Sequence, residues 1–106
     1  MKQKIESNHG TDNNGNPTGG HTTGMGIAIS WQNGPLGRGE NRREPNGAFV
    51  EGVIETAADR LRFYQSSKFA CETNANALRY LELALAELEK RTADREARAV
   101  EGTHTA

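Results

Sequence analysis

The chain contains little of what usually stabilises a small protein from within. Its 106 residues include a single cysteine, Cys71, so no disulfide can form within the chain. This cysteine usage fits a reducing, cytosolic setting best. Aromatic residues make up only 6% of the sequence and hydrophobic residues 34%, which predicts a thin core for a single domain. Domains of this kind are often completed by self-association.

The sequence also lacks an excess of one charge and any long apolar run. With a net charge of -1, it generates no general basic field that would attract duplex nucleic acid or an anionic membrane. No stretch approaches the roughly 20 apolar residues that span a bilayer, and the segment MKQKIESNHG lacks the apolar run of a secretory signal. We therefore expect neither a membrane nor duplex nucleic acid as a partner, and anions must be bound by local arginine clusters.

Residue patterns for catalysis or metal binding are missing as well. A phosphodiesterase would need a metal cluster or a paired acid and base, and neither is evident. His9 and His21 lack the spacing of metal ligands. We expect Cys71 to be a packed small hydrophobe rather than a nucleophile. The sequence therefore predicts no catalytic residue, no metal and no cofactor.

Composition divides the chain into an arm and one domain. Residues 1–24 are polar and rich in Gly, Asn and Thr, which predicts a flexible N-terminal arm. Residues 25–104 are predicted to form a single domain made of a strand, a loop and a helical hairpin. The strand is indicated by the alternation of Ile27, Ile29 and Trp31 with small residues.

Two helices are predicted after the loop. Asn46 is a candidate cap for a first helix that runs to about Gln65, and the second helix should span about residues 69–99, with Ser67 as a candidate cap. Because the link between them is short, they should form an antiparallel hairpin. The second helix carries one apolar seam of Leu78, Leu81, Leu85 and Leu88, and another of Ala77, Tyr80, Leu83 and Ala84. One partner helix cannot cover both seams, so we expect at least a dimer.

The glycine-rich loop QNGPLGRGENRREPNGAF carries Arg38, Arg42 and Arg43. Such a loop can bring backbone N–H groups and guanidinium forks onto a phosphate. It lacks the Gly-Lys-Ser/Thr ending of a Walker A loop. The alternative interpretation is a solvated hairpin loop.

Two further groups of residues are candidates for binding a nucleotide. Tyr64 at the end of the first helix and Asn74 early in the second should lie close in a hairpin, where an aromatic ring can stack on a base and an amide can read its edge. Core and surface roles are the alternative. A C-terminal arginine cluster of Arg91, Arg95, Thr103 and His104 could bind phosphate. Interaction with the helix C-terminus and with neighbouring acids is the alternative there.

Three segments cover roughly residues 25–104, namely WQNGPLGRGENR, PNGAFVEGVIETAADRLRFYQ and FACETNANALRYLELALAELEKRTADREARAVEGTH. Together they resemble the phage Thoeris anti-defence proteins, a hairpin family shared with anti-CBASS sponge proteins. The resemblance implies an α+β fold, in which a small antiparallel β-sheet precedes a long two-helix hairpin. It also implies assembly as a dimer or, in some members, a hexamer.

The resemblance further implies a protein without catalytic activity. Such proteins bind and sequester cyclic nucleotide signals of bacterial defence in the cytoplasm of the infected host. Their ligands are cyclic ADP-ribose isomers joined ribose to ribose, such as glycocyclic ADP-ribose, and in some members cyclic di- and trinucleotides.

Site residues follow from the resemblance position by position. Tyr64 stands where the family has an aromatic that stacks on adenine, and Asn74 at its pocket asparagine. The C-terminal arginine cluster matches a second site for larger cyclic ligands. Loop residues would close over the phosphates, namely Gln32, Asn33, Gly34 and one arginine among Arg38, Arg42 and Arg43. The runner-up hypothesis is a helical-hairpin assembly protein that binds another protein or structural nucleic acid.

Overall fold

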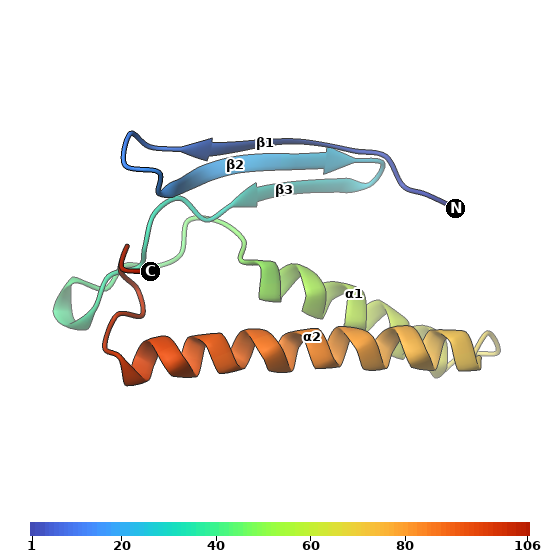
Figure 1. The fold of residues 1–106 in the computed structure, drawn as a ribbon. Coiled ribbons are helices and arrows are strands. Elements are labelled where there is room, and N and C mark those ends of the chain that lie inside the picture. The colour runs from blue at the N-terminus through green and yellow to red at the C-terminus, as the bar shows by residue number, and fades with distance from the viewer. The chain divides into compact units, whose positions relative to one another are not determined.

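The computed structural model describes residues 1–106 and divides into two compact units. The sheet unit comprises residues 1–49 and 100–106, and the hairpin unit comprises residues 50–99. The first contains a three-stranded antiparallel sheet and the second contains two packed helices (Figure 1). The predicted α+β fold class is thereby confirmed.

The sheet is a meander in chain order, β1 (Ile5–Thr11), β2 (Pro17–Gly24) and β3 (Ile27–Trp31), with β2 in the centre. The strand predicted from alternating isoleucines is β3. Gly26 takes a positive φ of 73° in the turn between β2 and β3, a conformation that glycine adopts without steric cost.

Strands β1 and β2 occupy residues for which we predicted a flexible arm. A polar ladder across the sheet explains the difference. The Thr22 hydroxyl, on a residue that is only 6% exposed, lies 2.9 Å from the Ser7 hydroxyl and accepts a hydrogen bond of 2.8 Å from the Trp31 indole. Hydroxyl-bearing and glycine residues produce little hydrophobic periodicity, so the two strands escape a search for apolar alternation.

A tight turn joins β1 to β2. One Asp12 carboxylate oxygen accepts backbone N–H groups of Asn14 at 2.8 Å and Asn16 at 3.0 Å. These bonds favour the ionised carboxylate, and the hydrogen bond from the Asn16 backbone is the largest cause that lowers the pKa of Asp12. Gly15, with φ of 79°, completes the turn.

The loop between β3 and the hairpin contains one short 3-10 helix, η1 (Gly39–Asn41). Beyond it the chain returns to β3, because the Ala48 N–H donates to the Ser30 carbonyl at 2.7 Å and the Gln32 N–H donates to the Ala48 carbonyl at 2.9 Å. Asn46, predicted to cap the first helix, lies within this loop, and α1 begins only at Val50.

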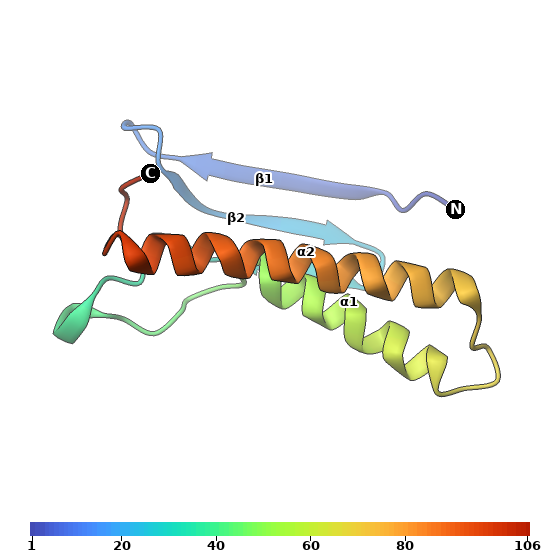
Figure 2. The ribbon, with the colours of Figure 1, turned by 60° about the horizontal axis from the view of Figure 1, so that its bottom comes forward.

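The hairpin unit consists of α1 (Val50–Gln65) and α2 (Glu72–Ala97). Ala58 is fully buried at the helix contact, and the predicted seam on α2 is half-buried at Leu78, Leu81, Leu85 and Leu88. With 26 residues against 16, α2 runs past the start of α1 in both ribbon views (Figure 1, Figure 2). No large side chain of the chain is fully buried, so the core is as thin as the composition predicts.

The start of α2 differs from the prediction. Cys71 is its N-cap, and the Cys71 sulfur accepts the Asn74 N–H at 3.4 Å. Cys71 is exposed, so its expected role as a packed hydrophobe is wrong. Ser67 braces the preceding turn instead of capping the helix, since its hydroxyl donates to the Tyr64 carbonyl at 2.6 Å and accepts the Phe69 N–H at 3.1 Å.

Neither helix combines the length and the apolar character that crossing a bilayer requires.

Candidate functional site

A side-chain network closes the glycine-rich loop. The Gln32 side-chain oxygen, Oε1, accepts the N–H groups of Asn46 at 2.8 Å and Gly47 at 3.2 Å, while its side-chain nitrogen, Nε2, donates to the Gly34 carbonyl at 3.1 Å. The Asn46 side chain accepts a hydrogen bond from the Asn33 N–H at 2.8 Å and donates one to the Asn33 carbonyl at 3.1 Å. The side chains of Gln32 and Asn46 therefore hold the loop closed around the backbone of Asn33 and Gly34.

The three loop arginines have different partners. Arg42 forms a bidentate ion pair with the Glu101 carboxylate, at 2.7 and 3.2 Å. Arg38 donates to the Glu101 carbonyl at 2.9 Å. Arg43 donates to the Pro35 carbonyl at 3.0 Å. All three guanidinium groups thus stabilise the sheet unit itself.

Glu101 was missed by the analysis of the sequence. Together with a hydrogen bond of 2.9 Å from the Gly37 N–H to the Gly102 carbonyl, it forms a C-terminal clamp of Gly37, Arg38, Arg42, Glu101 and Gly102. A Cβ on Gly102 would lie only 2.4 Å from the Gly37 carbonyl oxygen, so the two backbones could not approach this closely with a side chain there. The only sequence signal was an acid directly before Gly-Thr-His.

The clamp places Thr103 and His104 in the sheet unit. The Thr103 hydroxyl donates to the Val100 carbonyl at 2.5 Å and accepts the Thr105 N–H at 3.2 Å. His104 is exposed. After the larger effect of the hydrogen bond from Asn16, the charge of His104 also contributes to the lowered pKa of Asp12.

Tyr64 and Asn74 flank the turn of the hairpin, which we call the hairpin tip (residues 60–74). The Gln65 side chain bridges this turn by accepting the Cys71 N–H at 3.0 Å and donating to the Cys71 carbonyl at 3.1 Å. Tyr64 is 36% exposed and lies beside Phe63, with ring centroids 6.0 Å apart. The Asn74 amide donates to the Phe69 carbonyl over 3.4 Å, a long bond that a ligand could replace at little cost. The hairpin tip thus presents a partly exposed ring from the end of α1 and a weakly engaged amide from the start of α2.

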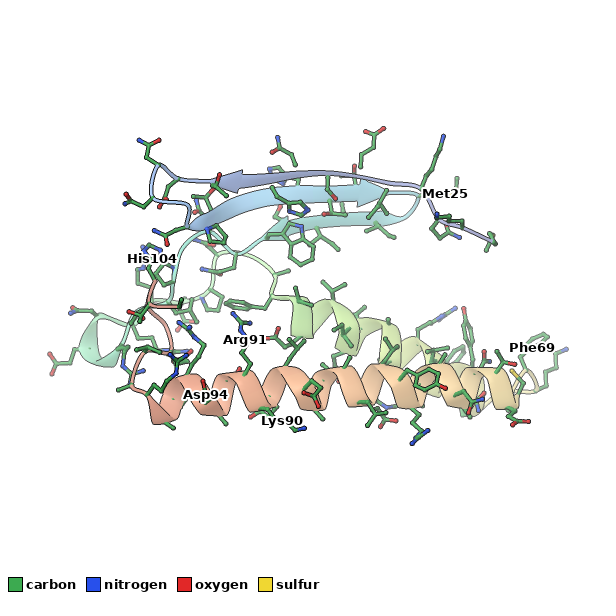
Figure 3. All side chains as sticks on the ribbon, viewed as in Figure 1. Met25, Phe69, Lys90, Arg91, Asp94 and His104 are labelled. Atoms are coloured by element: carbon green, nitrogen blue, oxygen red, sulfur yellow. The ribbon has the colours of Figure 1, made fainter.

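Arg91 and Arg95 lie one turn apart near the other end of α2. Figure 3 shows Phe69 at the hairpin tip and Arg91 far along the helix from it. Because Asn74 and Arg91 are separated by 17 helical positions (91 − 74), about 26 Å lies between them along the axis. Within the hairpin unit, the structure therefore keeps the tip residues and the paired arginines apart.

Comparison with known proteins gives two matches. A family model described as the Acb2/Tad1 hairpin domain matches residues 25–93. A phage protein named "Thoeris anti-defense 1", from Bacillus phage SBSphiJ7, is 42% identical over 78 residues, which cover 74% of this chain and 52% of that protein. The chain thus spans about half the length of this curated relative.

The C-terminal clamp generates a prediction. We expect Glu101→Gln to weaken the clamp and to raise hydrogen exchange at the Gly37 amide, which donates to Gly102. Since the Arg42 side chain is 43% exposed, solvent screens the ion pair, and a loss of up to about 1 kcal/mol corresponds to a rise of about two- to fivefold. Glu44→Gln, in the same loop, is the matched control. Equal protection of Gly37 in both variants would contradict the clamp.

Proposed function

This chain belongs to the Acb2/Tad1 hairpin family of phage Thoeris anti-defence proteins, and from that premise we propose that it is a non-catalytic sponge for cyclic nucleotide immune signals. The ligands are cyclic ADP-ribose isomers such as glycocyclic ADP-ribose, together with cyclic di- and trinucleotides of the CBASS type. Binding takes place in the cytoplasm of the infected bacterium and blocks the defence response.

The observation that supports this proposal most is the chemistry of the hairpin tip. The Tyr64 ring is partly exposed. Across the turn that the Gln65 side chain bridges, Asn74 presents an amide held by a long hydrogen bond to the Phe69 carbonyl. A flat ring and an oriented amide are what a nucleobase needs for stacking and for hydrogen bonding of its edge.

Sequestration requires affinity and abundance but no chemistry on the ligand. When the concentration of free protein exceeds the dissociation constant, most of the signal is bound. The concentration of free signal then falls roughly by the ratio of free protein to the dissociation constant. The polar loop of the sheet unit, with Gln32, Asn33, Gly34 and its arginines, supplies further candidates for contacts with phosphates.

We also propose that the protein is a homo-oligomer, a dimer or a hexamer. Two apolar side chains of the second seam on α2 are largely exposed, Tyr80 at 63% and Leu83 at 50%. A second copy of the chain would remove them from water and complete the thin core.

Leu83→Glu tests the oligomer, because an unpaired carboxylate at the contact between copies carries a large desolvation cost. We expect light scattering to show smaller particles than the wild type gives. Glu82→Gln, on the neighbouring α2 position, is the control and should leave the particle size unchanged. A wild type that is already monomeric at micromolar concentration would refute this assembly.

The ligand itself can be tested at the hairpin tip. We expect Tyr64→Ala and Asn74→Ala each to weaken binding of glycocyclic ADP-ribose in calorimetry, because loss of a base stack costs about 1–3 kcal/mol, or roughly one to two decades in affinity. Tyr64→Phe keeps the ring and should bind like the wild type, and Asn76→Ala is the control for the amide.

The binding experiment with the wild type distinguishes three functions. Ligand recovered intact after denaturation supports a sponge, whereas altered ligand would indicate an enzyme. No binding of any cyclic nucleotide by the folded wild type would favour the alternative function, a helical-hairpin assembly protein that binds another protein or structural nucleic acid.

Arg91 and Arg95 are proposed to bind the larger cyclic ligands at a separate place on the hairpin unit. Guanidinium groups one turn apart can each hold phosphate through two hydrogen bonds, so Lys should substitute poorly. We expect the double change to Ala to abolish binding of a cyclic trinucleotide while glycocyclic ADP-ribose still binds. A folded oligomer that loses both ligands would show that one composite pocket serves both.

A further inference from the structure

Cations and aromatic rings gather at the hairpin tip. The Arg60 guanidinium carbon lies 4.9 Å from the ring centroid of Phe63 and 4.9 Å from that of Tyr64. The two rings are inclined at 52° to each other, so Arg60 sits over both of them. In the connection between the helices, the Lys68 ammonium lies 5.3 Å from the Phe69 centroid. Attraction of this kind between a cation and a ring is modest at exposed sites and fixes where the cation lies.

Arg60 differs from the arginine two residues later. Arg62 forms ion pairs with Glu55 at 2.7 Å and Glu82 at 3.9 Å, and its hydrogen bond to Glu55 is the main cause that raises its pKa. Arg60 takes part in no ion pair and contacts rings instead. Rings leave the guanidinium N–H groups unused, and these groups are donors suited to phosphate oxygens.

A nucleotide bound at Tyr64 needs such a donor. A cyclic ADP-ribose isomer carries a pyrophosphate, and an anion moved out of water requires a counter-charge. Tyr64 and Asn74 supply a ring and an amide but no positive charge. Arg91 is about 26 Å from Asn74 along α2, too far for one ligand of this size to reach both in the same hairpin.

We propose that Arg60 binds the pyrophosphate of a nucleotide whose base stacks on Tyr64. This inference rests on the proposed function and adds a residue to the ligand site at the hairpin tip. Arg60 then selects for nucleotides that carry phosphate over neutral nucleosides. Its position over the Tyr64 ring means that base stacking and phosphate binding use adjacent surfaces of one helix.

Arg60→Gln tests the proposal, with Arg79→Gln as the matched control. Arg79 is an exposed arginine of α2 that takes part in no ion pair or ring contact, so its change removes the same charge elsewhere on the hairpin. Circular dichroism first confirms that both variants are folded. Calorimetry then measures the affinity for glycocyclic ADP-ribose at low and at high salt, in each variant and in Arg60→Lys.

We expect Arg60→Gln to bind the ligand about ten- to hundredfold more weakly than Arg79→Gln, the effect of one lost charge-assisted contact. Its affinity should also depend less on salt than that of the wild type, because one charge pair is gone. Arg60→Lys keeps the charge, so it should keep the salt dependence with an intermediate affinity.

Other outcomes overturn the inference. Equal affinities of Arg60→Gln and Arg79→Gln would remove Arg60 from the site. A weakened Arg60→Gln with the salt dependence of the wild type would show that Arg60 acts only through the Tyr64 ring and touches no phosphate. If the wild type binds other cyclic nucleotides but no cyclic ADP-ribose isomer, this inference fails alone. If the wild type binds no cyclic nucleotide at all, the proposed function fails and takes this inference with it.

Discussion

The ion pair between Arg42 and Glu101 is the side-chain contact that ties the C-terminal residues of the sheet unit to its glycine-rich loop. The two residues are 59 positions apart, and the whole hairpin unit lies between them in the chain. The pair, with the Gly37–Gly102 hydrogen bond, brings the chain back to the glycine-rich loop after the second helix. Thr103 and His104 owe their place in the sheet unit to this return, and the loop gains from it the contacts with Glu101 and Gly102.

The arginines of this protein differ in the groups that they contact, and these contacts decide whether their charge is neutralised. Arg42 and Arg62 face carboxylates, so their charges are neutralised within the chain. Arg38 and Arg43 donate to backbone carbonyls, which fixes the loop but leaves a positive charge. Arg60 rests on aromatic rings. Although the net charge of the chain is -1, the surfaces around Arg38, Arg43 and Arg60 therefore carry local positive charge that can attract an anion.

The helices could be predicted from the sequence because the leucine seam has the helical period over a long stretch. Other features could not. Strands β1 and β2 are stabilised by Thr22, Ser7 and a distant indole, and no local pattern signals that ladder. The cap of α2 is a cysteine, a residue outside the usual capping set. The places of Tyr64 and Asn74 on either side of the hairpin turn follow from local helix signals and could be predicted, whereas the partner of Arg42 is distant in sequence and could not.

The division of the chain has a consequence for how such proteins can vary. Residues 50–99 leave the sheet unit and return to it as one uninterrupted segment, so in the chain the hairpin is a module inserted into the sheet unit. Because the C-terminal clamp lies outside that module, helical turns can be added or deleted in register on α1 and α2 without altering the clamp's own contacts. Selection could thus change the length of the hairpin, and with it the reach between its two ends, while the sheet unit stays as it is.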